Sequence, residues 1–408
     1  MTRRVVYAAC AALALAAAVG GCGGDDGWTA RDVPAEYPTI QETVDAARSG
    51  DLVRIAPGVY HEEVVVPATK HDLVLRGTDR NRVVLDGGNG RRHEGIVVHG
   101  DGVAVENLTV RGFGSDAILF APPPDAKNPL RGWRVSYVTL ANNALHGVDA
   151  LHAQGGTIEH AWASGAGNAG LRIGRCLPCD ALVADSVVED SATGFEAVNA
   201  GGNIVVARSQ FRHNRVGVTL VTAGDDATYH QQDSAVVGNI IADNDDAHAA
   251  GRGDAFGIGV LVRGGRRDGL ARNLITGHPG AGILLTSSDE KTPAAEVSVQ
   301  GNVLRHNGVD LVVVPRPGQR TSNGSCFAQN RFSTSLPAAI EKALPCQADV
   351  PVRAGIPPLP ASPPRVDWRS IALPSPQPSL PQAATAKPKP ARKPSRLDVA
   401  KVGVPGGS

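Results

Sequence analysis

The sequence predicts an all-β solenoid, in which short strands wind into successive coils around one apolar core. Short segments in the middle of the chain each begin with a small residue and then alternate, which is the two-residue period of a strand. Their first residues are Gly95, Ser115, Gly147, Gly170, Gly194, Gly217, Gly257, Gly282 and Gly308. The steps from Gly147 to Gly170, Gly194 and Gly217 are 23, 24 and 23 residues. A repeat in the twenties with several strands per unit is typical of a solenoid.

A second phase of the repeat places Asn or Ser at one corner of most coils. The residues at this corner are Asn107, Ser186, Ser209, Asn239, Asn273 and Asn302. Asparagine tolerates left-handed backbone conformations, and stacked side-chain amides can bond to one another along the axis. We therefore expect a polar ladder. The 48 glycines and the aromatic content of 4% agree with tight turns around small aliphatic side chains.

The N-terminal residues predict an export signal with a lipid anchor. Arginines precede an apolar run from Val5 to Val19, which is too short to span a bilayer comfortably. The run ends in VGGC, which resembles the lipobox of bacterial lipoproteins. We expect residues 1–21 to be removed, Cys22 to be lipidated and residues 22–36 to form a tether on the outer face of the bacterial membrane. The alternative is an ordinary secretory signal in which Cys22 has no role.

The remaining cysteines predict two disulfides. Four cysteines outside the cytoplasm are an even number, which favours pairing. Proximity in sequence pairs Cys176 with Cys179 and Cys326 with Cys346. The first pair could instead be a redox or zinc half-site, although the sequence has no second Cys-x-x-Cys and no flanking helical pattern.

The two ends of the solenoid differ from its coils. An amphipathic helix is expected over residues 40–48, followed by a stop at Gly50, and it would cap the open end. Residues 324–346 are expected to form a disulfide-closed C-terminal cap. Residues 351–408 hold 14 of the 29 prolines and several basic residues, so we expect a disordered, semi-extended tail.

The repeat resembles the right-handed parallel β-helix of pectate-lyase-like proteins, over residues 37–350. Residues 58–62 also fit the Gly-x-Tyr-x-Glu run that opens pectin methylesterases and several other β-helix families. The catalytic motifs of pectin methylesterases and polygalacturonases, and the Asp-Pro-His of mannuronan epimerases, are missing. The resemblance therefore implies the scaffold and no catalytic set. Tyr60 and Glu62 are expected to seat the capping helix or the first turns.

The repeat register predicts where a site would lie. The residues one and three positions after each leading small residue are apolar and should face inward, so the residue between them should face outward. In three successive coils this residue is Asp149, Arg172 and Glu196. Strands about 4.8 Å apart would place the two carboxylates roughly 10 Å from each other. His152 and Asn199 lie slightly further along at matching positions.

Insertions flank these coils and could form the walls of a groove for a long polar ligand. They cover residues 121–131 and 222–233, and the second supplies Asp225, Asp226, Tyr229 and His230. A third insertion, residues 243–254, leaves from another corner. It could bind a cation through Asp243, Asp245 and Asp246, and Ca²⁺ is the one cofactor that the sequence suggests.

These observations favour a monomeric, surface-anchored β-helix protein that binds an extracellular polysaccharide along its strand face. Nucleic acid is excluded as a general partner, because 40 basic and 40 acidic residues leave no net field. The alternative is a polysaccharide lyase or glycoside hydrolase acting on an acidic glycan. In a lyase, Arg172 would resemble the arginine base of β-helix lyases; in an inverting hydrolase, Asp149 and Glu196 would be acid and base.

Two further interpretations remain. The entry motif is similar to that of accessory proteins for copper-enzyme maturation, but a mature chain without Met or a dense His cluster gives soft-metal handling little support. An alternating acid-base ladder can also be structural, because it avoids stacking like charges on neighbouring strands.

Overall fold

The computed structural model describes residues 27–224, 228–251, 255–289, 292–315, 323–346, 357–391 and 396–406. The predicted export signal and Cys22 lie outside the described residues. No helix in the described ranges combines the length and the apolar character that a membrane span requires.

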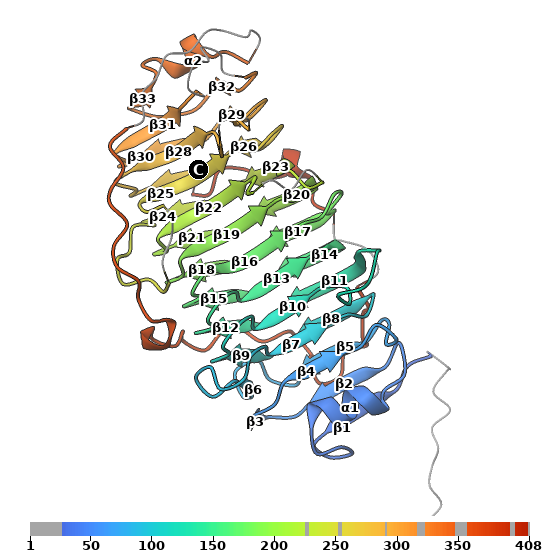
Figure 1. Ribbon diagram of the computed structural model, residues 1–408. Helices are drawn as coiled ribbons and strands as arrows, with labels where there is room; N and C mark the ends of the chain where they lie inside the picture. The colour runs from blue at the N-terminus through green and yellow to red at the C-terminus, as the bar shows by residue number, and fades with distance from the viewer. Residues whose placement is uncertain are drawn as a thin grey trace, which may run out of the picture.

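The chain forms a parallel β-helix in which three sheets run along one axis (Figure 1). The first sheet contains β1 (Ala30–Val33), β2 (Leu52–Ile55), β5 (Val74–Gly77), β8 (Val103–Glu106), β11 (Leu130–Ser136), β14 (Ala153–Glu159), β17 (Ala181–Ala184), β20 (Gly201–Ala207), β23 (Gln232–Val237), β26 (Gly269–Ala271), β29 (Ser298–Gln300) and β32 (Cys326–Ala328). The second contains β4 (Val64–Val66), β7 (Ile96–Val98), β10 (Ile118–Phe120), β13 (Val148–Leu151), β16 (Ala169–Gly174), β19 (Thr193–Val198), β22 (Val216–Val221), β25 (Ile258–Arg263), β28 (Ala281–Thr286), β31 (Val309–Val313) and β33 (Ser335–Leu336). The third contains β3 (Gly58–Tyr60), β6 (Val83–Asp86), β9 (Thr109–Arg111), β12 (Thr139–Ala141), β15 (Trp162–Ser164), β18 (Val187–Glu189), β21 (Gln210–Arg212), β24 (Ile240–Ala242), β27 (Leu274–Thr276) and β30 (Val303–Arg305).

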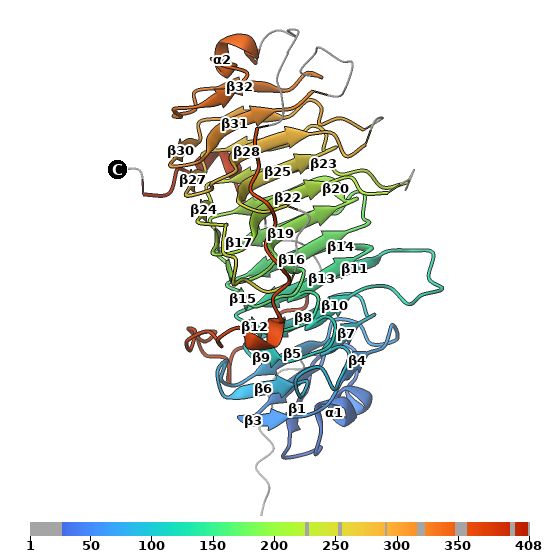
Figure 2. The same ribbon diagram turned by 60° about the vertical axis from the view of Figure 1, so that its left-hand side comes forward.

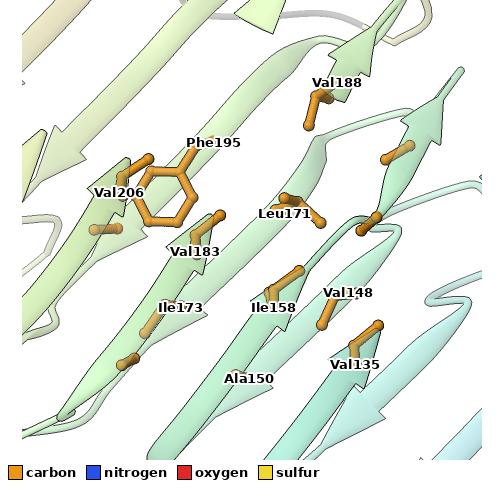
Figure 3. Packing of buried hydrophobic residues seen from close by; sticks show 14 of the residues in the cluster. Val135, Val148, Ala150, Ile158, Leu171, Ile173, Val183, Val188, Phe195 and Val206 are labelled. Carbon is orange, nitrogen blue, oxygen red and sulfur yellow. The ribbon is translucent and has the colours of Figure 1, made fainter. Parts of the chain in front are cut away.

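The predicted segments that begin with a small residue all become strands of the second sheet, so the predicted fold class is confirmed. Their inward residues stack from coil to coil: Val148 pairs in register with Leu171, and Leu171 with Phe195. All three are fully buried in the core between the sheets, as Figure 3 shows. The leading glycines fit because a Cβ at Gly147 or Gly194 would stand 2.5 Å or less from a backbone carbonyl of the next coil.

The expected polar ladder runs between the first and third sheets. The backbone N–H and side-chain amide of Asn239 both donate to Asn273 Oδ1, at 2.9 and 3.0 Å, and Asn273 donates to Asn302 in the same way. Its members are Ser186, Ser209, Asn239, Asn273, Asn302 and Asn330. The expected member Asn107 is not part of this ladder: its amide donates to Gly77 O, and its Oδ1 accepts from the backbone N–H of Leu380 in the tail.

A second ladder, which the sequence analysis missed, precedes the strands of the second sheet. Its members are Ser191, Asn214, Asn244, His278 and Asn307. His278 is fully buried and bonds through Nδ1 to Asn307 Oδ1 at 2.8 Å, while Nε2 faces the amide of Asn244 at 3.1 Å. Burial lowers the pKa of His278 to about 4.

Replacing His278 with Asn, the residue found at neighbouring rungs, should reduce acid sensitivity. The unfolded chain takes up a proton near pH 6.5 and the folded protein only near 4. The contribution of His278 to the free energy of unfolding is therefore complete above pH 6.5, and it falls by about 1.4 kcal/mol per pH unit as the pH drops toward 4. Urea unfolding at both pH values should show that the free energy of unfolding lost between pH 7 and pH 5 is about 2 kcal/mol smaller in His278→Asn than in the wild type. An identical loss in both proteins would contradict this assignment.

The N-terminal end is closed by α1 (Ile40–Ala46), as expected. Glu62 accepts hydrogen bonds from the backbone N–H groups of Ile40 and Gln41, at 3.0 and 2.9 Å, so its carboxylate lies at the positive end of the helix. Tyr60 donates to Ala56 O. The expectation that Gly-x-Tyr-x-Glu serves the scaffold thus holds for Glu62. The proposed tether is too long, however, because β1, within residues 22–36, already pairs with β2 in the first sheet.

Both predicted disulfides are present. Cys176 is bonded to Cys179 in the turn after β16, and Cys326 is bonded to Cys346 across the C-terminal cap. The cap includes α2 (Ile340–Ala343), and the first ladder ends there because Glu341 accepts from Asn330.

The prediction of a disordered tail is wrong for residues 357–391 and 396–406, which pack along the coils (Figure 2). Arginines of the β-helix donate to tail carbonyls: Arg215 to Pro363 and Pro364, and Arg76 to Ala386. A proline-rich chain leaves its carbonyls without internal partners, which is why it suits these donors. The tail also contains two short 3-10 helices, η1 (Trp368–Ser370) and η2 (Val399–Lys401).

The tail contacts the first and third sheets and the turns that precede the second. Ala391 packs on the outer face of the first sheet, and Asn142, after β12, donates to Ile371 O at 2.7 Å. Arg215 stands just before β22. The contacts of the described tail thus leave the middle of the second sheet's outer face uncovered.

Candidate functional site

The three predicted outward residues form one ion-paired row in the middle of the second sheet. Asp149 in β13 pairs in register with Arg172 in β16, which pairs with Glu196 in β19. Arg172 Nη1 donates to both carboxylate oxygens of Asp149, at 2.9 and 2.7 Å, and its Nε lies 3.3 Å from Glu196 Oε2. The strand register therefore brings the predicted set together.

Exposure differs along this row. The Arg172 and Glu196 side chains are 18% and 20% exposed, whereas that of Asp149 is only 5% exposed. Burial raises the pKa of Asp149, although the nearby His146 and Arg172 oppose the rise. The expectation that Asp149 lies at the surface is thus wrong in degree, and the accessible part of the row is the Arg172–Glu196 pair.

Two residues that the sequence analysis missed, Asp116 and His146, lie behind Asp149. Asp116 Oδ1 accepts from the backbone N–H of His146 at 3.1 Å and lies 2.8 Å from its Nδ1. Asn168 Nδ2 lies 3.0 Å from His146 Nε2, which assigns the imidazole proton to Nδ1. His146 Nδ1 is also 3.8 Å from Asp149 Oδ2. The repeat register could have identified both residues, because Asp116 and His146 each lie two residues before the start of neighbouring strands of this sheet.

Asp116, His146 and Asp149 are also the one group in the described ranges whose potential metal-ligand atoms lie within 4.8 Å of one another. Arg172 already neutralises Asp149 there. The predicted cation ligands Asp243, Asp245 and Asp246 do not form such a group. Burial, and then the charges of Asp243 and Asp246, raise the pKa of Asp245. A Ca²⁺ site in this insertion stays a prediction.

The other predicted ligand residues organise the described parts of the insertion between β22 and β23, residues 222–224 and 228–231, here called the 222–231 insertion. Asn199 exchanges two hydrogen bonds of 2.7 Å with the backbone of Ala223. Tyr229 Oη lies 3.3 Å from His152 Nε2, with the two rings edge to face. The insertion thus returns over the coil that carries Asp149. His230 is exposed, and Asp225 and Asp226 lie outside the described residues.

Charge is confined to three coils of the outward row. The preceding residue in register is Leu119, and the residues after Glu196 are Thr219 and then Leu261. Arg172 also lies over Gly174, where a Cβ would stand 3.2–3.4 Å from the guanidinium. A side chain at position 174 would therefore press on the guanidinium.

A family model described as a right-handed β-helix region matches residues 127–332, just over half of the chain. The chain belongs to the right-handed β-helix family. The match includes β13, β16 and β19 and therefore the complete ion-paired row. No curated protein sequence matches the chain significantly.

Solved structures resemble the chain at low identity. The A-module of mannuronan C-5 epimerase AlgE4 from Azotobacter vinelandii is 14% identical, with a TM-score of 0.50 over 72% of this chain and 91% of that one. The AlgE6 A-module from the same organism is 15% identical, with a TM-score of 0.49 over 72% and 92%. Tailspike protein 2 of Escherichia coli O157:H7 bacteriophage CAB120 is 12% identical, with a TM-score of 0.48 over 65% and 36%. At such identities the likeness shows the fold alone.

Proposed function

We propose that the protein is a lipid-anchored β-helix protein that binds an extracellular polysaccharide on the outer face of the second sheet. The observation that carries this proposal is the partly exposed Arg172–Glu196 pair, held in the middle of the face that the tail leaves open. A guanidinium and a carboxylate at the surface can form charge-assisted hydrogen bonds with sugar hydroxyls and with acidic groups. Cys22 supplies the anchor in this proposal.

The 222–231 insertion gives the binding face a wall. Tyr229 and His152 lie beside the ion-paired row, at the C-terminal ends of the second-sheet strands. Aromatic rings offer flat surfaces on which the apolar faces of sugars can pack, while the adjoining polar groups orient the hydroxyls. The mannuronan epimerase module, whose fold is similar, is named for action on a polysaccharide, and this agrees with a glycan ligand.

Catalysis is a second candidate, favoured by the buried group behind the row. Asp149 has a raised pKa, as a general acid needs, and Asp116 orients His146 beside it. In this alternative Asp149 would protonate the leaving oxygen and Glu196 would act as the base. The substrate would be a glycan lying over Arg172.

Incubation of the mature full-length chain with a panel of acidic and neutral polysaccharides tests both functions. Retention is measured by affinity electrophoresis, with and without Ca²⁺, and products by mass spectrometry. Retention without shortening supports binding alone, and shortened chains that disappear with Asp149→Asn support catalysis. Absence of both retention and cleavage across the panel would contradict the proposal. Arg208→Ala is the matched control, because Arg208 pairs with Asp185 outside the second sheet.

A further inference from the structure

Two buried polar groups meet at the base of the 222–231 insertion. Asp268 and Gln231 are 1% and 0% exposed, and Gln231 Nε2 donates to Asp268 Oδ1 at 2.9 Å. Asp268 Oδ2 and Gln231 Oε1 are both buried without a hydrogen-bond partner. Both stand within 2.6 Å of the point where a Cβ on Gly265 would lie, so these two acceptors converge on one small space.

The convergence is explained if the Asp268 carboxyl is protonated. A carboxylic acid and a carboxamide can form two hydrogen bonds, one donated by the amide N–H and one by the acid O–H. If the carboxylate were ionised, neither of these two buried oxygens would have a hydrogen-bond donor among the described residues, which costs free energy. Exchanging the amide nitrogen and oxygen of Gln231 does not remove the need for the acid proton. Burial also raises the pKa of Asp268 to about 7.

The charged neighbours of Asp268 are themselves paired and more exposed. Asp233, at the start of β23, raises the pKa, and Arg267, in the same turn as Asp268, lowers it. These two form an ion pair of 2.7 Å. Arg266 of that turn pairs with Glu296 of the next coil at 2.8 Å. Neither pair supplies a hydrogen-bond donor between Asp268 Oδ2 and Gln231 Oε1.

The same contacts tie down both stems of the insertion. Gln231 N–H donates to Thr222 Oγ1 at 3.1 Å, and Thr222 Oγ1 donates to Gly264 O at 2.8 Å. The backbone N–H of Ser234 donates to Asp268 Oδ1 at 2.9 Å. Tyr229 of the same insertion contacts His152. The contacts of Asp268 at the foot of the insertion therefore affect the position of this wall of the candidate site.

We propose that Asp268 is a positioning residue whose neutral carboxyl, paired with Gln231, holds the 222–231 insertion in place, and that ionisation of Asp268 loosens this wall of the binding face. The expected change in ligand affinity rests on the proposed glycan-binding function, whereas the loosening of the insertion does not depend on that function. An opened insertion exposes Asp268 to water, where a carboxyl has a pKa near 3.9. Opening should therefore become about tenfold more favourable per pH unit between roughly pH 5 and 7, and level off above 7.

Hydrogen exchange of the full-length protein between pH 5 and pH 8 tests the inference without any ligand. The protection factors of the Gln231, Asp233 and Ser234 amides, corrected for intrinsic rates, should fall about tenfold per unit up to pH 7. Asp268→Asn should abolish this dependence, because two amides form the same pair of hydrogen bonds with no titratable proton. Asp233→Asn is the control and should keep the dependence with a slightly lower midpoint, because a negative neighbour is removed.

Two results would overturn the proposal. One is wild-type protection that stays constant from pH 5 to 8, and the other is an equal pH dependence in Asp268→Asn. A glycan retained by the wild type should also lose affinity over this pH range, and Asp268→Asn should remove that loss. If no glycan is retained while the exchange results hold, the proposed function fails and the role of Asp268 in holding the insertion stands.

Discussion

Deletion of residues 357–408 is expected to lower the free energy of unfolding by about 5 kcal/mol or more. The deletion removes Trp368, which is 3% exposed, and the burial of this side chain against the coils is alone worth about 3 kcal/mol. Arg76, Arg80 and Arg215 are at most 3% exposed, and each donates to tail carbonyls that the deletion removes. The tail also bridges coils far apart along the axis, so its loss should weaken cooperativity.

Urea unfolding followed by circular dichroism measures this effect. The truncated chain should unfold at a lower midpoint and over a broader transition than the full chain. Leu373→Ser is the control, because Leu373 is a tail residue that is 52% exposed, and it should change stability by less than about 0.5 kcal/mol. A midpoint that the deletion leaves unchanged would show that the tail does not bind the coils in solution.

Arg172→Ala is expected to have the largest effect of any single change at the candidate site. It leaves Asp149, whose side chain is 5% exposed, without the guanidinium that donates to both of its oxygens, and breaking a buried pair in this way costs about 3–5 kcal/mol. It also removes the cation from the binding face, so affinity for the retained glycan should fall by about a hundredfold. Chemical unfolding and affinity electrophoresis measure the two effects.

Glu196→Gln separates binding from stability at the same row. The side chain keeps its shape and is 20% exposed, so unfolding should change by less than about 1 kcal/mol. Glycan affinity should nevertheless fall about tenfold, because one charged acceptor is lost. Arg208→Ala, which breaks the exposed pair with Asp185, should alter neither property appreciably. Equal affinities in wild type and Glu196→Gln would remove this glutamate from the binding face.

The sequence predicted the coils well because their signal is local and periodic. The row of Asp149, Arg172 and Glu196 followed from strand alternation and the repeat length, and neighbouring strands bring those residues into register. Glu62 was assigned to the scaffold from its place in the entry motif, and it accepts from the first turn of α1. Both disulfides followed from sequence proximity.

The remaining features depend on contacts that no periodicity encodes. Composition marked the tail as disordered, because prolines cannot build a core, but arginines distant in sequence supply donors for its carbonyls. Asp116 and His146 precede their strands, so strand alternation gave no reason to select them. The Asp268–Gln231 contact joins equivalent turns of two adjacent coils. These turns differ in length, so the two-residue alternation of the strands does not align their residues.

Hydrogen exchange of the full-length protein with and without its retained glycan tests the binding face most directly. We expect added protection in β13, β16 and β19 and in residues 228–231, where the ion-paired row and Tyr229 lie. The competing location is the hollow of about 480 Å³ between Arg208, Ile240 and tail residues 397–405. Protection confined to that hollow, with the second sheet unchanged, would contradict the account.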